Sequence, residues 1–293
     1  MSFSNAELLV QKKNYLDNFN THLTYSIQFS FHDISIHFKS DSQDLIDEIK
    51  NFIPMSWKKY DTNVSYIICH NSLPIALDQW DNEESSEIYT EKNVAIQRDF
   101  VASFNKESNT SHAIFLPKVC DGFFNYFRWF LSERLITNQK SILHCSALLD
   151  EQRKAHIFLG PSGAGKTTIT ELSSPRTILG DDMNLVKINK SQEILCSPGA
   201  VGGLYWPQVD LDESFSIAGI YWITQSESEN KIATISKTKQ FQYLYSSIAN
   251  IAWESASEKF LSDSWNFTQE VLKNHEIKNL HFKKDASFWK LLS

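Results

Sequence analysis

The 293-residue sequence predicts an α/β protein in which a smaller α+β domain precedes a larger α/β domain. Residues 1–120 alternate short strand-like and helical patterns. Residues 141–293 contain an apolar strand, a glycine-rich loop and a helix-compatible stretch in direct succession, which is typical of α/β units. An aromatic helical segment over residues 121–140 connects the two predicted domains.

The composition is that of a folded protein without a basic face. Apolar residues make up 42% of the chain, charged residues 22%, and the formal net charge is −7. Nucleic-acid binding normally requires clustered positive charge, so a nucleic-acid partner is disfavoured. Residues 1–20 contain no continuous apolar core and predict neither a secretory signal nor a membrane span. We therefore predict a cytoplasmic protein without a membrane partner.

The cysteines are too widely separated to indicate a metal site or a disulfide framework. Cys69, Cys120, Cys145 and Cys196 include no C-x-x-C pair. We predict four reduced, buried thiols that act as small core hydrophobes.

The predicted N-terminal domain contains short strands and one amphipathic helix. Strand patterns cover residues 23–31, 34–38, 64–69, 94–102 and 113–116, with a turn at His32 and Asp33. A helix is predicted over 45–53, where Pro54 ends it. The acidic stretch 77–93 predicts an exposed loop.

The connecting helix over residues 122–138 is apolar almost all round. This pattern predicts burial between layers, and we favour an interdomain core helix over a cofactor-stacking site. In the larger domain, strands are predicted over 142–149, 155–159, 177–179, 185–188, 217–224 and 232–235, and helices over 241–260 and 261–275. His156 is expected to be a buried or edge residue of its strand.

A complete phosphate-binding motif, G-x-x-x-x-G-K-[ST], follows the strand over 155–159. The residues predicted to bind a nucleoside triphosphate are Gly160, Ser162, Gly163, Ala164, Gly165, Lys166, Thr167 and Thr168. The glycines let successive N–H groups turn inward, and the following helix directs its positive end toward the same point. Lys166 is expected to reach the β and γ phosphates, and the Thr167 hydroxyl to bind Mg²⁺.

Two adjacent carboxylates follow the next predicted strand. Asp181 and Asp182 stand where a nucleotide site needs a second Mg²⁺ ligand. One of the pair can bind metal while the other acts as a base toward an attacking hydroxyl.

Three segments together resemble one superfamily. They are Leu-His-Cys-Ser-Ala at 143–147, the strand and loop at 157–168, and Ile-Leu-Gly-Asp-Asp at 178–182. The series resembles the superfamily shared by HPr serine kinase/phosphorylase and phosphoenolpyruvate carboxykinase, and the His-x-Ser-Ala strand distinguishes it from ordinary nucleotide kinases. The chain is most similar to HPr-kinase-related proteins, which have a small N-terminal domain and an apolar end like residues 288–292. The resemblance implies a P-loop domain of this type.

The resemblance also implies roles for individual residues. Lys166 and Thr167 match phosphate and Mg²⁺ ligands, and Asp181 and Asp182 match an acidic pair with metal and proton-transfer duties. His144 matches a histidine near the metal and the transferable phosphate, although the strand pattern by itself favours a core or strand-end histidine.

Two departures from the superfamily bear on the chemistry. Val201 stands where carboxykinases have an acidic residue, which counts against carboxykinase activity. The arginines are Arg98, Arg128, Arg134, Arg153 and Arg176, so none follows residue 176. Arg176 can face the phosphates; otherwise an arginine must come from another subunit or from the substrate. A homo-oligomer is therefore left open.

We predict an ATP-dependent, Mg²⁺-requiring P-loop kinase, a transferase that phosphorylates a hydroxyl, with catalytic residues Asp181, His144 and Lys166. Asp181 is expected to take the acceptor proton, Thr167 and Asp182 to hold Mg²⁺, and residues 199–203 to close as a lid. The expected acceptor is a serine of a protein or peptide. A small-molecule hydroxyl kinase and a non-catalytic nucleotide-binding regulator are the alternatives.

Overall fold

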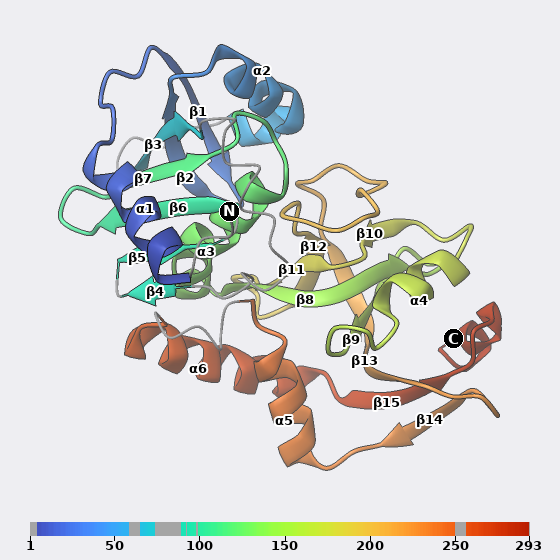
Figure 1. Cartoon of the computed structure of the whole chain (residues 1–293). Helices are drawn as coiled ribbons and strands as arrows, with labels where there is room; N and C mark the ends of the chain where they lie inside the picture. Colours follow the sequence, from blue (N-terminus) through green and yellow to red (C-terminus); the bar gives the residue numbers. More distant parts are fainter. Residues whose placement is uncertain are drawn as a thin grey trace. The chain divides into compact units, whose positions relative to one another are not determined.

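The computed structural model describes residues 5–58, 65–73, 89–91, 93–97, 99–249 and 256–292. The chain divides into two compact units, which are Met1–Phe130 with Trp253–Ala256 (unit 1) and Leu131–Ala252 with Ser257–Ser293 (unit 2). The division falls inside helix α3 (Asp121–Thr137). As limits of independently folding parts, the boundaries at 120 and 141 stay a prediction. Figure 1 shows the elements of both units.

Unit 1 contains a 7-stranded mixed sheet in the order β1-β2-β3-β7-β6-β5-β4. The strands are β1 (Tyr25–Phe31), β2 (Ile34–Ser40), β3 (Ser65–Ser72), β4 (Tyr89–Glu91), β5 (Val94–Ile96), β6 (Phe100–Asn105) and β7 (Thr110–Phe115). β3 runs parallel to both β2 and β7, and the other neighbours are antiparallel. The predicted strand at 94–102 is two strands, because the Gln97 amide donates to the Phe100 carbonyl and turns the chain.

The helices of unit 1 are α1 (Asn5–Asp17), α2 (Gln43–Phe52), the short η1 (Met55–Lys58) and the first part of α3. α2 begins where the Ser42 side chain accepts a hydrogen bond from the Leu45 amide, and it ends before Pro54, as predicted. α1 was not expected from the sequence pattern. Most of the loop predicted at 77–93 lies outside the described residues, but β4 occupies its end.

The aromatic side chains of α3 form the centre of the unit 1 core. Phe123, Tyr126, Phe127 and Phe130 are at most 1% exposed. They contact sheet residues in tilted, edge-on and stacked ring pairs, among them Phe31–Phe127 at 5.3 Å and Phe115–Tyr126 at 5.5 Å between centroids. The predicted burial of the aromatic helix is confirmed, whereas its place between two domains stays a prediction.

Unit 2 contains an 8-stranded sheet in the order β10-β8-β11-β12-β13-β15-β14, with β9 paired to both β8 and β13. The strands are β8 (Lys140–Leu149), β9 (Ala155–Leu159), β10 (Ile178–Gly180), β11 (Met183–Ile188), β12 (Ile194–Pro198), β13 (Phe215–Gln225), β14 (Lys231–Thr234) and β15 (Ile277–Phe282). β9, β13 and β15 are mutually parallel, so their carboxyl ends meet at one edge of the sheet. The phosphate-binding motif starts at that edge.

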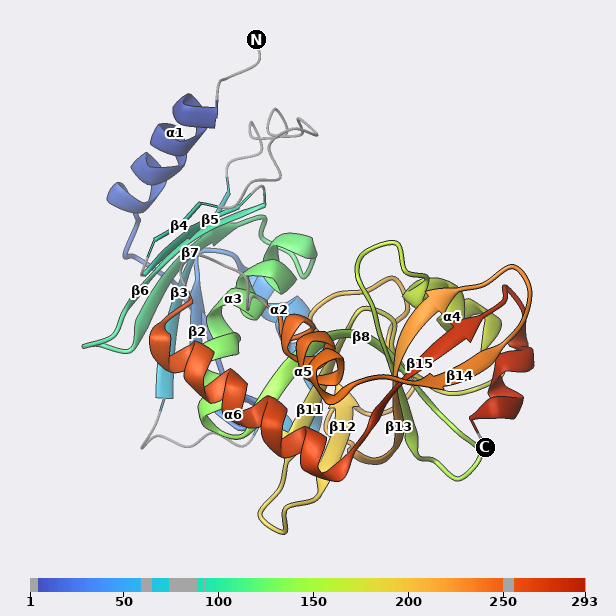
Figure 2. The same cartoon turned by 90° about the horizontal axis from the view of Figure 1, so that it is seen from below.

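The helices of unit 2 are α4 (Lys166–Leu172), α5 (Lys237–Ser246), α6 (Glu258–Asn274) and the short η4 (Ala286–Leu291). The helix predicted over 241–260 is not continuous, because α5 ends at Ser246, Ile248 pairs with Leu143 in a β-bridge and α6 begins only at Glu258. Residues 250–255 of that prediction lie outside the described residues. β12 and β15 were missed. η4 returns to α4, where the Trp289 indole donates to the Ser173 hydroxyl (2.8 Å), and both views show the C-terminal segment at that place (Figure 2).

The prediction that all four cysteine thiols are buried is only partly confirmed. Cys145 and Cys196 are buried, whereas Cys69 and Cys120 are partly exposed, and all four are free. Within the described part of the chain, no helix has the length and apolar character needed to cross a bilayer.

Candidate active site

The loop between β9 and α4 has the backbone of an anion-binding turn. Gly163 (φ +78°) and Gly165 (φ +104°) adopt left-handed conformations that favour glycine. A Cβ at Gly165 would lie 2.8 Å from a ring carbon of Phe282, so no larger residue fits there without displacing that ring. The Gln225 side-chain amide at the end of β13 donates to the Gly163 carbonyl (3.2 Å) and holds the tip of the loop.

Lys166 directs its ammonium into this loop. The residue is 7% exposed, and Nζ donates to the carbonyls of Gly160 (3.0 Å) and Pro161 (3.2 Å). Burial lowers the pKa of Lys166, and the nearby carboxylates of Asp182 and Asp181 act in the opposite direction. A buried cation among carbonyl dipoles is well placed to bind an incoming phosphate.

Asp181 follows β10 and links three segments of the site. It is 2% exposed, and its Oδ2 accepts a hydrogen bond from the Thr167 hydroxyl (3.2 Å). Its Oδ1 accepts from the backbone amides of Leu204 (2.9 Å) and Tyr205 (3.0 Å). Both carboxylate oxygens therefore have partners, which makes a buried charge tolerable.

The oxygens of Thr167 and Asp181 suit a magnesium ion. Their separation of 3.2 Å is close to the spacing of about 3 Å between neighbouring ligands of an octahedral ion with bonds near 2.1 Å. No group of three or more His, Cys, Asp or Glu residues that could hold a metal is found in the described ranges. Mg²⁺ is usually held by one or two protein ligands together with phosphates and water, and Thr167 and Asp181 would supply two such ligands.

Asp182, the next residue along the chain, pairs with His144. His144 Nε2 lies 2.8 Å from Asp182 Oδ1, and the two side chains are 35% and 32% exposed. The register of β8 and β11 sets His144 opposite Met183, next to Asp182. The Cys145 amide also donates to the Asp182 carbonyl (2.7 Å), which fixes the backbone. A carboxylate and an imidazole in contact form a pair that can accept and hold a proton.

The buried residues beside the His144–Asp182 pair have a structural role. Asn184 is fully buried, and its side-chain amide donates to the carbonyls of Cys145 (2.9 Å) and Gly180 (3.1 Å), which joins β8, β10 and β11. Burial raises the pKa of the Cys145 thiol to about 12, so this thiol is not a nucleophile at neutral pH.

The remaining predicted loop residues occupy different environments. Ser162 is exposed at the turn, and Thr168 is half-buried in the first turn of α4. The Ala164 amide donates to the Pro161 carbonyl (3.1 Å), while its side chain packs against the apolar core around Phe158. Their roles in nucleotide binding stay predictions.

Arg176 and His156 lie at the opposite end of α4 from the loop. The Arg176 guanidinium lies 4.1 Å from the centre of the Trp289 ring and 3.6 Å from Glu151, so the expectation that it faces the phosphates is not supported. His156 is 1% exposed and bonded to Asp150 at 3.2 Å, as expected for a buried histidine.

The segment 199–205, predicted to act as a lid, is partly buried, and its closure stays a prediction. Ala200 and Val201 are buried, and the burial of Val201 accounts for an apolar residue at that position. Sequence reasoning missed that the amides of Leu204 and Tyr205 bind Asp181. The Gly202-Gly203 pair was the available signal, since both glycines have positive φ and turn the chain toward Asp181.

Comparison with protein families supports part of the predicted relationship. Residues 118–214, about a third of the chain, match the family described as phosphoenolpyruvate carboxykinase. The search of curated proteins found no match. The matched segment contains the phosphate loop, His144 and both aspartates. The match supports a nucleotide-binding domain of the superfamily that the carboxykinases share with HPr kinase. It suggests ATP-dependent phosphotransfer or a carboxykinase-like reaction.

Proposed function

We propose that the chain is an ATP- and Mg²⁺-dependent phosphotransferase that transfers the γ-phosphoryl group to a hydroxyl, that of a serine in a protein or peptide. One observation carries the proposal. Three groups lie around one loop, and each supplies one function that phosphoryl transfer needs. Lys166 is a phosphate ligand, the Thr167–Asp181 contact provides metal ligands, and the His144–Asp182 pair provides a proton acceptor.

We assign the two aspartates in the reverse of the order expected from the sequence. Asp181 is buried and already shares a contact with Thr167, so these two side chains would hold Mg²⁺, which neutralises charge on the phosphates. Asp182 is partly exposed and its Oδ1 contacts an imidazole, so it is the better base.

The reaction then follows from these positions. The acceptor hydroxyl approaches the γ-phosphorus in line with the leaving oxygen, and its proton passes to the Asp182–His144 pair. A new P–O bond to the acceptor forms as the bond to the β-phosphate oxygen breaks, and ADP leaves. Lys166 stays on the phosphate oxygens throughout.

A nucleotide-binding regulator is the second candidate, and the distribution of arginines favours it. Arg153 and Arg176 form ion pairs with Glu213 (3.0 Å) and Glu151 (3.6 Å), and the chain has no arginine after residue 176. Phosphoryl transfer gains much from a guanidinium at the phosphates. A kinase built on this site must rely on Lys166 and Mg²⁺ or receive an arginine from a partner.

A labelled-phosphate assay separates these functions. The protein is incubated with γ-labelled ATP and fractionated lysate, and the label is followed in protein and small-molecule fractions, with Lys166→Ala as the background. Label transferred only by the unmodified protein supports a kinase. Tight ATP binding with no transfer to any fraction would support the regulator.

A further inference from the structure

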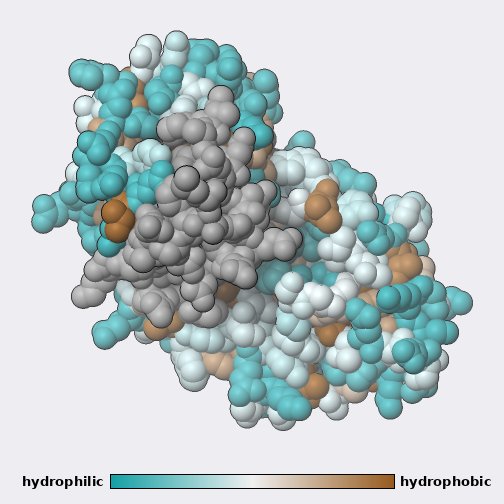
Figure 3. Space-filling view, in the orientation of Figure 1, coloured by the Kyte–Doolittle hydropathy of each residue, from teal (hydrophilic) through white to brown (hydrophobic). Residues whose placement is uncertain are grey.

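Two large apolar side chains are exposed beside the candidate active site. Six large hydrophobic residues are exposed in the described ranges, and Leu204 (84%) and Trp206 (47%) lie two positions apart. The other four are spread over separate elements and are Val10, Met55, Trp265 and Leu291. On the face in Figure 3, the coloured hydrophobic residues form small separate patches. Single exposed apolar residues are ordinary, but a pair next to a site is informative.

The backbone accounts for the exposure of Leu204. The consecutive amides of Leu204 and Tyr205 converge on Asp181 Oδ1, an arrangement that turns both side chains away from the carboxylate. The Tyr205 hydroxyl donates to Glu171 on α4 (3.2 Å), whereas Leu204 extends into solvent.

The segment that carries these side chains is held at both ends. At one end Gly203 lies so close to Asp181 that a Cβ would be 2.5 Å from Oδ1. At the other end Gln208 exchanges two hydrogen bonds of 2.9 Å with the backbone of Ile178. Because these contacts hold the segment at both ends, binding to it is expected to cost little conformational entropy.

The charge on this flank disfavours an anionic acceptor. Residues 191–230 contain no lysine or arginine and include six acidic residues, Glu193, Asp210, Asp212, Glu213, Glu227 and Glu229. Arg153, which precedes β9 and reaches this range, is already paired with Glu213 (3.0 Å), so the range offers a phosphorylated or carboxylated metabolite six carboxylates and no cation of its own. A neutral or basic peptide is not repelled by these carboxylates. Its apolar side chain can bind here without removing a charge from water.

We infer that Leu204 and Trp206 form a docking site for the acceptor, a peptide segment in which a large apolar residue lies within two positions of the phosphorylated hydroxyl. This inference rests on the proposed kinase function and names its substrate class. The two side chains bind the acceptor and set specificity, while the chemistry stays with His144, Asp181 and Asp182.

Synthetic peptides test the inference directly. Each peptide contains one serine and differs only in having Leu, Ala or Asp two positions away, and kcat/KM is measured with γ-labelled ATP. We expect roughly a tenfold preference for the Leu peptide over the Ala peptide, the usual effect of an apolar contact, and discrimination against the Asp peptide. Leu204→Ala and Trp206→Ala should each reduce the Leu/Ala ratio several-fold.

Trp265→Ala is the matched control, because Trp265 is 49% exposed but lies on α6. It should leave the Leu/Ala ratio at its original value. A ratio near one in the unmodified protein, or a ratio unchanged in both loop variants, overturns the inference. Label that enters only small molecules of a lysate overturns this inference and the serine acceptor, but leaves the proposed phosphoryl transfer to a hydroxyl intact. Absence of transfer to every acceptor removes the kinase proposal and this inference with it.

Discussion

The Thr167 hydroxyl lies 3.2 Å from Asp181 Oδ2, and this contact joins the first turn of α4 to the residue that follows β10. The other oxygen of the same carboxylate holds the amides of Leu204 and Tyr205. Asp181 therefore connects the phosphate loop with the segment we propose as the acceptor docking site. Changes at this carboxylate should affect metal binding and the docking segment together.

Lys166→Ala should remove ATP turnover and weaken ATP binding by at least about tenfold, because the buried ammonium is the charge that the loop directs at the phosphates. Titration calorimetry with Mg·ATP measures the affinity. Lys190→Ala, on an exposed turn, is the charge-matched control. Turnover at the original rate in Lys166→Ala would contradict the assignment of the loop.

The two aspartates should respond differently to removal of their charge. Asp181→Asn should raise the Mg²⁺ concentration needed for half-maximal turnover at least about tenfold, because it weakens the ligand next to Thr167. Asp182→Asn should lower turnover by about 10²-fold and leave Mg·ATP affinity within about tenfold, as expected for loss of a base. Activity is measured across a Mg²⁺ titration. The exchanged pattern would restore the assignment made from the sequence.

Gly203→Ala should disturb Asp181, whereas Gly202→Ala should not. Both glycines have positive φ (+108° and +135°), so both substitutions strain the backbone. Only the Cβ at Gly203 would meet a carboxylate oxygen at 2.5 Å, since the nearest atom to a Cβ at Gly202 is 3.8 Å away. We expect a higher Mg²⁺ requirement for Gly203→Ala alone. Equal Mg²⁺ profiles for the two variants would show that the Gly203 contact does not matter.

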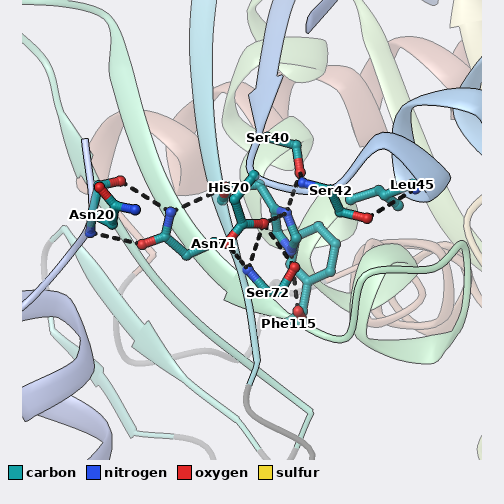
Figure 4. A network of polar contacts seen from close by, with 9 residues as sticks. Asn20, Ser40, Ser42, Leu45, His70, Asn71, Ser72 and Phe115 are labelled. Atoms are coloured by element: carbon teal, nitrogen blue, oxygen red, sulfur yellow. Dashed lines mark hydrogen bonds and ion pairs between the residues drawn. The ribbon is translucent and has the colours of Figure 1, made fainter. Parts of the chain in front are cut away.

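His70 should make unit 1 less stable in acid. The ring is fully buried, its Nε2 donates to the Phe115 carbonyl (3.1 Å) and its Nδ1 contacts the Ser40 hydroxyl (2.9 Å), as Figure 4 shows. Burial lowers the pKa of His70 to about 4, although Phe115 and Asp41 act in the opposite direction.

The unfolded chain takes up the His70 proton near pH 6.5, before the folded protein does. The contribution of His70 is therefore complete above pH 6.5 and is lost as the pH falls toward 4, by at most about 1.4 kcal/mol per pH unit. Urea unfolding at a series of pH values should show a smaller slope for His70→Gln, with His22→Gln at an exposed position as the control. An unchanged slope in His70→Gln would mean that His70 titrates normally.

Local patterns were sufficient wherever neighbouring residues decide the structure. The strands around His32 and Asp33, the helix ended by Pro54, the buried aromatic helix and the strand that precedes the phosphate loop were all predicted within a few residues. The helix predicted over 241–260 ends at Ser246, because Ile248 pairs with Leu143 of β8, a contact about a hundred residues away along the chain. β12 and β15 were missed for a related reason, since their pairing partners rather than their own residues define them as strands.

By itself, the sequence determined the phosphate-binding motif, the acidic pair and the histidine ahead of them, because each depends on residue type at a short spacing. The tertiary structure decided which partner each of these side chains contacts. Asp181 and Asp182 are adjacent and chemically identical, yet one is buried against Thr167 and the other pairs with His144. Both aspartates lie in the bend between β10 and β11, so the partner of each carboxylate depends on how these strands pair with β8, and no local pattern contains that pairing.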